Sequence, residues 1–290
     1  IDAYIRKLNL RYRDLKSTEY RAIKNEYYKF FAKEIVRSGK KRKQVWENGW
    51  NQNLLDVLEQ GVSSDTLLPY YYKKNEFPLR FKGKYIYPED PEFVIKFLSI
   101  IQKILSKQYF GRYKNIYEFG CGPFHNIYEF SLNTINKNYH GLDWSEATIE
   151  ISRIIEERKS ELGVGSHVFS GTVMDFFDPD YCHEMKDNSI IFTFGCMEQL
   201  GGDFNMILEY FLRQKCKNFL HIEPINELYS RDIEFDDLAF RYSVKRGYLT
   251  GFFSKLRDLE GLGKIRIHCC NKIIGNRFHD VWTFLRWERI

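Results

Sequence analysis

Residues 117–123 read Tyr-Glu-Phe-Gly-Cys-Gly-Pro, and this stretch decides the fold class. It ends a short apolar run that begins at Asn115, which is typical of a buried strand, and a helical pattern follows it. The glycines at positions 120 and 122 permit a sharp turn and a close approach of the backbone to a ligand. The free N–H groups at the start of the following helix would face the same ligand. The stretch therefore predicts the first strand, turn and helix of a βα unit.

The same alternation continues along the chain. Strand-like runs cover residues 139–144, 167–175, 189–195 and 219–224, with helical runs over 146–159 and 204–215 between them. Strands that alternate with helices of this length are typical of a parallel, doubly wound sheet. Two later strand-like runs, 264–270 and 281–287, are separated by a short turn-rich segment and predict an antiparallel pair. We therefore predict an α/β fold with a mostly parallel, doubly wound, seven-stranded sheet and an antiparallel last strand.

The first 110 residues have a different pattern. Apolar residues recur at helical spacing from Tyr20 to Ile35, and a second helix is expected over 51–58 with its end at Gly61. Four of the seven prolines lie between residues 69 and 91, which predicts a loop or a short hairpin, and a helix follows Pro91. We predict an N-terminal helical region and lid over 1–110 and a ligand-binding domain over 111–290.

Composition limits the class of protein. The chain has 290 residues, of which 43% are hydrophobic and 29% charged, as in ordinary globular proteins. None of the six cysteines forms a C-x-x-C pair, which favours a reducing compartment over a zinc site or disulfide framework. No stretch is long and apolar enough for a membrane helix, and the first residues lack the apolar core of a signal peptide. A cytoplasmic protein without a membrane span is expected.

Basic residues are concentrated at the N-terminus. Residues 1–45 contain 14 Lys and Arg against 5 Asp and Glu. Such a segment is either the solvated face of an amphipathic helix or an arm that meets nucleic acid or another anionic partner. The sequence favours the solvated helix and leaves the nucleic-acid arm open.

Acidic residues mark the ends of the predicted strands. Glu118 ends the first strand and Asp143, followed by Trp144, ends the second. Asp175, followed by Phe176, ends the third. The carboxyl ends of parallel strands form the ligand-binding edge of such sheets, and an acid there can accept hydrogen bonds from both hydroxyls of a ribose. A dinucleotide fingerprint would need glycine at position 125, where this chain has His125.

Together these strand-end motifs resemble those of the class I, Rossmann-like S-adenosylmethionine (SAM)-dependent methyltransferases. The resemblance covers residues 110–290 and implies SAM as cofactor, with no metal. It implies that Gly120 and Gly122 face the methionyl part, that Glu118 orients its amino group, and that Asp143 binds the ribose. By the same resemblance Trp144 belongs to the cofactor site, and Asp175 with Phe176 contacts the adenine. Phe124 departs from the family pattern, in which a third glycine is frequent, and is expected to reshape the pocket near the methionyl part.

Three residues are candidates for catalysis. Methyl transfer to a hydroxyl or a protonated amine benefits from a base. Glu198, just after the fourth strand, is the first candidate, and Glu223, at the end of the fifth strand, is the second. His125 lies near the same edge, as does His140, although a lone histidine is more often structural. Glu223 can equally be a strand-end carboxylate bonded to the backbone.

Substrate contacts are expected from two regions. Gln199 follows Glu198 and can orient substrate or cofactor, and Tyr72 and Arg80 belong to the predicted lid. Arg241 and Tyr248 lie on one or two helices predicted over 228–258 and can contact an anion or a sugar. Surface arginines on a helix are the equally open alternative for Arg241.

The acceptor is less constrained by the sequence. The N/D/S-P-P-Y/F/W motif for methylation of planar amino groups is absent after the fourth strand, where the chain reads Phe-Gly-Cys-Met over 194–197. The chain is faintly similar to methyltransferases of bacterial surface-polysaccharide biosynthesis. We therefore expect O- or N-methylation of a small polar acceptor, a sugar or polysaccharide precursor. An RNA methyltransferase that uses the basic arm, and a catalytically silent SAM-binding partner subunit, remain alternatives.

Overall fold

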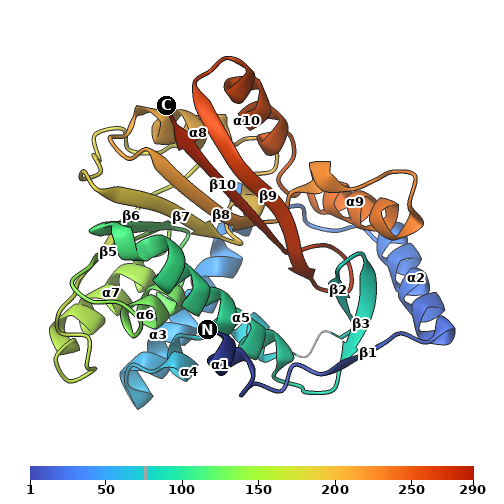
Figure 1. Ribbon diagram of the computed structural model, residues 1–290, viewed down its shortest axis with the longest axis horizontal. Coiled ribbons are helices and arrows are strands. Elements are labelled where there is room, and N and C mark those ends of the chain that lie inside the picture. Colours follow the sequence, from blue (N-terminus) through green and yellow to red (C-terminus); the bar gives the residue numbers. More distant parts are fainter. Residues whose placement is uncertain (75–76) are drawn as a thin grey trace.

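The computed structural model describes residues 1–74 and 77–290, and one mixed sheet organises them (Figure 1). The strand order is β1-β3-β2-β9-β10-β8-β7-β4-β5-β6. The strands are β1 (Tyr12–Asp14), β2 (Leu79–Phe81), β3 (Lys84–Pro88), β4 (Asn115–Phe119), β5 (Asn138–Asp143), β6 (Val168–Val173), β7 (Ser189–Phe194), β8 (Asn218–Glu223), β9 (Ile265–Gly275) and β10 (Trp282–Arg289).

The seven strands after residue 110 have the predicted arrangement. β4 pairs in parallel with β5 and with β7, β5 with β6, and β7 with β8. β10 runs antiparallel to both β8 and β9 and lies between them. Within these seven strands the predicted mostly parallel pairing and the antiparallel last strand are confirmed, whereas the whole described sheet is mixed, with five antiparallel and four parallel pairings.

The predicted strand count of seven is wrong, because the sheet in the described part of the chain has ten strands. The additional three come from the N-terminal region: β2 pairs with β9, β3 with β2, and β1 with β3. The predicted hairpin forms with a two-residue turn at Lys82 and Gly83, which both have positive φ as such turns require. Asn75 and Glu76, in the preceding predicted loop, lie outside the described residues. The exposed edge of β9 supplies unpaired backbone groups that the hairpin satisfies, a long-range pairing that local patterns do not reveal.

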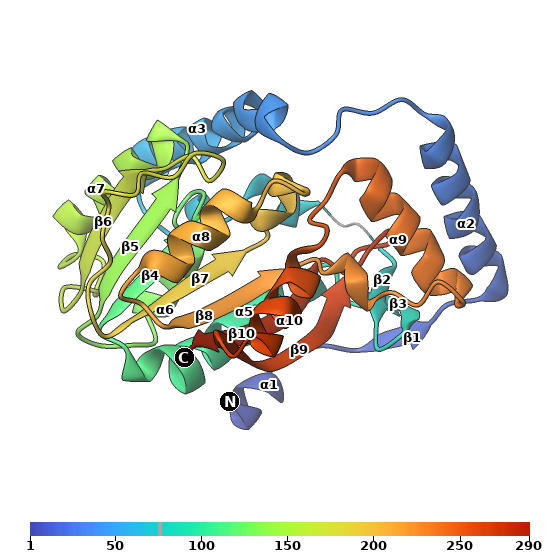
Figure 2. The same ribbon diagram turned by 90° about the horizontal axis from the view of Figure 1, so that it is seen from above.

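Helices cover both faces of the sheet (Figures 1 and 2). One hydrophobic cluster joins one face to the helices on the α5 and α6 side, and a second joins the other face to α8 and α10. Alternate residues of β7 serve the two clusters, with Ile190 and Phe192 in the first and Ile191 in the second. The helices are α1 (Asp2–Ile5), α2 (Ser17–Ala32), α3 (Lys43–Gln60), α4 (Ser64–Leu67), α5 (Phe93–Ile104), α6 (His125–Ser131), α7 (Glu146–Arg158), α8 (Asn205–Arg213), α9 (Glu234–Arg246) and α10 (Phe252–Gly261), with short turns η1 (Lys40–Arg42), η2 (Tyr70–Lys73), η3 (Leu105–Tyr109), η4 (Phe110–Arg112), η5 (Met197–Leu200) and η6 (Asn226–Leu228).

The N-terminal helices match the expected pattern in kind but differ in extent. α2 lies beside α9 at the end of the molecule where β1, β2 and β3 lie, and Tyr27 is fully buried there (Figures 1 and 2). α3 ends at Gly61 as predicted but begins eight residues before the predicted start at position 51. The division of the chain near residue 110 stays a prediction. No helix within residues 1–74 and 77–290 is long and apolar enough to cross a bilayer.

Candidate functional site

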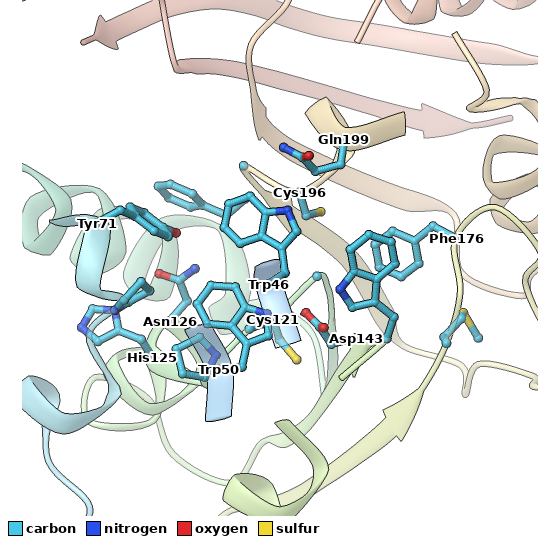
Figure 3. Close-up of a pocket in the computed structure, with 18 of the residues that line it drawn as sticks. Trp46, Trp50, Tyr71, Cys121, His125, Asn126, Asp143, Phe176, Cys196 and Gln199 are labelled. Carbon is cyan, nitrogen blue, oxygen red and sulfur yellow. Dashed lines mark hydrogen bonds between the residues drawn. The ribbon is translucent and has the colours of Figure 1, made fainter. Parts of the chain in front are cut away.

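A cavity, which we call the glycine-turn cavity, opens at the carboxyl edge of the parallel strands (Figure 3). It contains about 810 Å³ of empty space, open solvent at its mouth included. Its floor comes from the turns after β4, β5, β6 and β7, and its roof from α3 and the segment around η2. The site predicted from strand-end residues therefore exists as a hollow in the fold.

The glycine turn after β4 lies against the turn after β7. Gly120 has φ 69°, and a Cβ placed on it would lie 2.2 Å from the Cβ of Cys196. Gly122 has φ 51°, and its Cβ would lie 3.0 Å from the indole of Trp50. Only glycine combines these backbone angles with such close approaches.

Phe124 does not enter the cavity, so the expectation that its ring reshapes the pocket is wrong. The residue is fully buried in the hydrophobic cluster on the α6 side, and its ring packs where a Cβ of Gly141 would be. Its backbone is left-handed, with φ 67°, and it precedes the first residue of α6. The ring fills the core beneath the turn and leaves the ligand side to Gly120 and Gly122.

Asp143 lines the cavity and is buried. Its Oδ2 accepts a hydrogen bond from the Gly122 N–H at 3.0 Å, and its Oδ1 accepts one from the Ser145 N–H at 3.1 Å. Burial raises the pKa of this carboxyl to about 6, against the lowering effect of these backbone donors. Asp143 thus couples the end of β5 to the glycine turn and remains mostly ionised at neutral pH.

Glu118 lies behind the glycine turn and is fully buried. Its Oε1 accepts a hydrogen bond from the Asn126 side chain at 2.7 Å, whereas its Oε2 has no hydrogen-bond partner among the described residues. Burial raises the pKa of Glu118 to about 8, and Asn126 opposes that shift. Asn126 lines the cavity and Glu118 does not, so Glu118 would act on a ligand through Asn126 or water.

An aromatic wall continues from Asp143. Trp144 stacks on Phe177 with ring centroids 6.5 Å apart, and both line the cavity together with Phe176 and Met174. Asp175 does not line the cavity. Its Oδ1 accepts a hydrogen bond from the Phe177 N–H at 2.9 Å. Asp175 therefore fixes the turn that carries the rings, and its predicted contact with adenine stays a prediction.

Two tryptophans of α3 form the roof, and the sequence did not identify them. Trp46 and Trp50 lie one helical turn apart with ring centroids separated by 5.6 Å. Figure 3 shows both indoles across the cavity between Tyr71 and Phe176. Their i, i+4 spacing was the only local signal, because their contact with the glycine turn joins distant parts of the chain.

Glu198 and Gln199 occupy adjacent places in η5. The Gln199 Nε2 donates to the Glu198 Oε1 at 2.9 Å, and the Gln199 Oε1 lacks a hydrogen-bond partner within the described residues. Gln199 lines the glycine-turn cavity, and Glu198 lines a second cavity beside it. Burial, followed by the charge of Glu223, raises the pKa of Glu198 to about 7. A carboxyl with this pKa can accept a proton near neutral pH.

Glu223 lines neither cavity. It is fully buried, and its Oε1 accepts a hydrogen bond from the Cys196 N–H at 3.1 Å and lies 3.6 Å from the Cys196 Sγ. Burial raises the pKa of Glu223 to about 7. This placement suits a residue that positions the turn after β7, the structural alternative left open by the sequence.

The two histidines differ in position. His125 lines the glycine-turn cavity, and its Nδ1 lies 3.3 Å from the Gln102 amide nitrogen. His140 lines neither cavity and bonds to the Ser170 hydroxyl at 2.7 Å. Burial lowers the pKa of both rings to about 4, so both are neutral at physiological pH.

The predicted substrate residues separate into two groups. Tyr72 lines both cavities and Tyr248 lines the second. Arg80 is fully buried and makes ion pairs with Asp236 at 3.1 Å and Asp280 at 3.3 Å, so it ties β2 to the first turn of α9 and to the loop between β9 and β10. Arg241 is exposed on α9, 3.8 Å from Asp237, and lines neither cavity. The structure thus brings the two tyrosines to the site and leaves the two arginines outside it.

Comparisons with known proteins complete this description. No protein-family profile matches the sequence, and no curated protein matches it. The chain is similar to an O-methyltransferase family protein from Burkholderia thailandensis, at 11% identity and a TM-score of 0.47, over 68% of this chain and 57% of that one. It is also similar to the N-methyltransferase NodS from Bradyrhizobium japonicum in complex with S-adenosylhomocysteine, at 12% identity and a TM-score of 0.47, over 69% and 89% of the two chains.

A third similar structure is the dimethyltransferase RosA from Streptomyces davawensis, at 13% identity and a TM-score of 0.46, over 86% of this chain and 71% of that one.

Proposed function

We propose that the chain is a SAM-dependent methyltransferase whose cofactor occupies the glycine-turn cavity. The observation that carries this proposal is the position of Asp143, a buried carboxylate at the end of β5 that is hydrogen-bonded to the amide of Gly122. A carboxylate in this position suits ribose hydroxyls at the carboxyl edge of a parallel sheet.

The remaining cavity residues fit the other parts of the cofactor. The rings of Trp144, Phe176 and Phe177 supply a flat apolar wall for adenine. The unpartnered Glu118 Oε2 is a buried acceptor that suits the amino group, through Asn126 or water. A nearby ammonium would favour the ionised form of Glu118, whose pKa of about 8 otherwise leaves it mostly protonated.

The chemistry divides between the two cavities. Bound SAM supplies an electrophilic methyl group, which moves to an acceptor oxygen or nitrogen while the electron pair of the broken C–S bond stays on sulfur. The chain has to align the acceptor, and alignment of this kind supplies much of the acceleration. We expect Glu198 to take the acceptor proton, since its pKa of about 7 leaves about half of the molecules ionised at neutral pH. Gln199, whose side chain donates to Glu198, would orient it.

For the acceptor we propose a small polar compound, with a sugar or polysaccharide precursor as the first choice. The second cavity has a tyrosine-rich and tryptophan-containing lining, which suits the apolar faces of a sugar ring as well as a planar ring. Its lining includes Tyr71, Tyr72, Tyr248 and Trp282.

Calorimetry with S-adenosylhomocysteine tests the proposal, with NAD as the control ligand. S-adenosylhomocysteine is expected to bind at micromolar concentration and NAD not to bind. Asp143→Ala should weaken binding at least tenfold, about 1.4 kcal/mol. Asp178→Ala, which removes an exposed carboxylate near the aromatic wall, should leave affinity unchanged. Equal affinity in wild type and Asp143→Ala, or binding of NAD in its place, would contradict the assignment.

A further inference from the structure

A second cavity adjoins the glycine-turn cavity and shares Trp46, Tyr71, Tyr72 and Gly195 with it. It contains about 1360 Å³ of empty space, open solvent included. Glu198 lies in its lining, so a molecule bound there would have one end beside the proposed base and beside the shared wall. This cavity is the natural place for an acceptor.

Two arginines enter this cavity from different parts of the chain. Arg42 ends η1, just before α3, and Arg246 is the last residue of α9. Both are partly buried. The chain holds the two segments together, because the backbone N–H and the hydroxyl of Ser38 both donate to the Arg246 carbonyl, at 2.8 and 3.0 Å. The two guanidinium groups are therefore brought to one cavity by specific contacts.

Neither guanidinium makes an ion pair within 4.0 Å in the part of the chain that the structure describes, and Glu198 interacts with both only at longer range. Arg42 lies 5.6 Å from the Trp46 ring centroid, and its buried Nε has no hydrogen-bond partner within residues 1–74 and 77–290. Arg246 donates from Nε to the Tyr248 hydroxyl at 3.1 Å and makes no ion pair within 4.0 Å among these residues. By contrast, the neighbouring Arg80 has two carboxylate partners. Within the described residues, the fold thus gives the buried Arg80 two carboxylates in contact and leaves the two half-buried arginines at the cavity without a carboxylate within 4.0 Å.

The charge of the cavity is positive. Lys74 also lines it, and Glu198 is the only acidic residue in its described lining. Both arginines act to lower the pKa of Glu198, but burial and the charge of Glu223 outweigh them and raise it to about 7, and one partly protonated carboxyl cannot balance two guanidinium groups. Guanidinium groups withdrawn from water are costly to leave unpaired, and their planar array of donors fits carboxylate and phosphate oxygens.

We propose that the acceptor carries an oxyanion, a carboxylate or a phosphate, which Arg42 and Arg246 hold in the second cavity. This inference rests on the proposed function, because it specifies the substrate class of the same site. The oxyanion anchors the acceptor, and the hydroxyl group of the acceptor lies beside Glu198. Sugar acids, sugar phosphates and aromatic hydroxy acids share this chemistry.

Calorimetry on protein saturated with S-adenosylhomocysteine tests the proposal with matched pairs of probes. Glucose 6-phosphate is compared with glucose, and 4-hydroxybenzoate with 4-hydroxybenzamide. At least one anion is expected to bind at least tenfold more tightly than its neutral counterpart. Arg246→Gln and Arg42→Gln should each weaken that anion at least tenfold, and Arg246→Lys should weaken it less. The pair that shows the difference identifies the source as a sugar or an aromatic acid.

Arg241→Gln is the matched control, because Arg241 lies on the same helix but lines neither cavity. It should leave the affinity for the anion unchanged. Equal binding of anionic and neutral probes, an equal loss in Arg241→Gln, or no binding of either anion at about 10 mM would overturn the proposal. Binding of S-adenosylhomocysteine is measured separately in every variant. Its failure would remove the proposed function, whereas anion binding to the ligand-free protein that depends on Arg42 and Arg246 would still support the anion site.

Discussion

At Gly120 the chain meets two separate requirements. The backbone has φ 69°, and a side chain at this position would collide with Cys196 on the neighbouring turn. Cys196 cannot easily withdraw, since its N–H is bonded to the buried Glu223 and its thiol donates to the Phe119 carbonyl at 3.0 Å. The turns after β4 and β7 are thus held together at the floor of the glycine-turn cavity.

Gly120→Ala is expected to abolish binding of S-adenosylhomocysteine and to destabilise the fold. The comparison is Gly163→Ala, where φ is 72° but no atom lies within 4 Å of the added Cβ. Gly163→Ala should cost about 1–2 kcal/mol through backbone strain alone. Gly120→Ala should cost at least about 2 kcal/mol more, because the collision adds to the strain. Urea unfolding measures the difference, and equal costs in the two variants would show that the two turns are not in close contact.

Residues at strand ends could be predicted from sequence because their position follows from local pattern. Gly120, Asp143 and Gln199 all line the cavity for that reason. Arg80 could not be placed, because its partners Asp236 and Asp280 lie more than 150 residues away. A charge in a lid-like segment gives no sign of whether it faces solvent, ligand or a buried carboxylate.

Among the helices, α3 supplies part of the roof of the glycine-turn cavity. Trp50 packs against Gly122, and Trp46 reaches the wall that the two cavities share. Any ligand in the glycine-turn cavity would lie between these indoles and the strand ends. Opening of α3 would therefore require that ligand to lose one side of its contacts.

Binding of S-adenosylhomocysteine is accordingly expected to slow hydrogen exchange in α3. If opening of the helix releases the ligand, saturation at about 100 times Kd adds up to about 2.7 kcal/mol, or a hundredfold in exchange rate. Mass spectrometry of peptides from residues 43–60 measures the effect. α10 packs in the cluster on the opposite face and serves as the internal reference, with little change expected. Unchanged exchange in α3 at saturation would mean that it is not a cover for the ligand.

The extent of α3 and the three N-terminal strands show where local pattern fails at this scale. The expected helix over 51–58 is present, but its first two turns include a glycine, and the spacing of Trp46 and Trp50 was too weak a signal there to extend the predicted helix. β1, β2 and β3 are three to five residues long and gain their stability from a pairing series in which β2 joins the edge of β9, β3 joins β2 and β1 joins β3. Both features depend on contacts between parts of the chain that sequence periodicity treats separately.

At the scale of the whole molecule, the site concentrates buried carboxyl groups at one edge of the sheet. Burial raises the pKa of Glu118 to about 8, those of Glu198 and Glu223 to about 7, and that of Asp143 to about 6. In the unfolded chain such groups ionise near pH 4. As pH rises, the unfolded state therefore releases these protons before the folded state does, and stability falls until pH passes the folded pKa values.

The ligand-free protein is therefore expected to lose stability between pH 6.5 and 8.5. Buried histidines do not oppose this change, because the lowered pKa of His125, at about 4, matters only below the ordinary histidine value near 6.5. Two groups with a pKa of about 7 and one of about 8 lower the free energy of unfolding by roughly 3 kcal/mol over this range. Urea unfolding at each pH measures this change. Glu118→Gln, which keeps an acceptor for Asn126, should remove more than half of the fall, and the exposed Glu161→Gln should remove none. A flat stability profile, or the same slope in Glu118→Gln, would mean that Glu118 is already ionised without a cationic partner, and its role in holding an ammonium group would lose its basis.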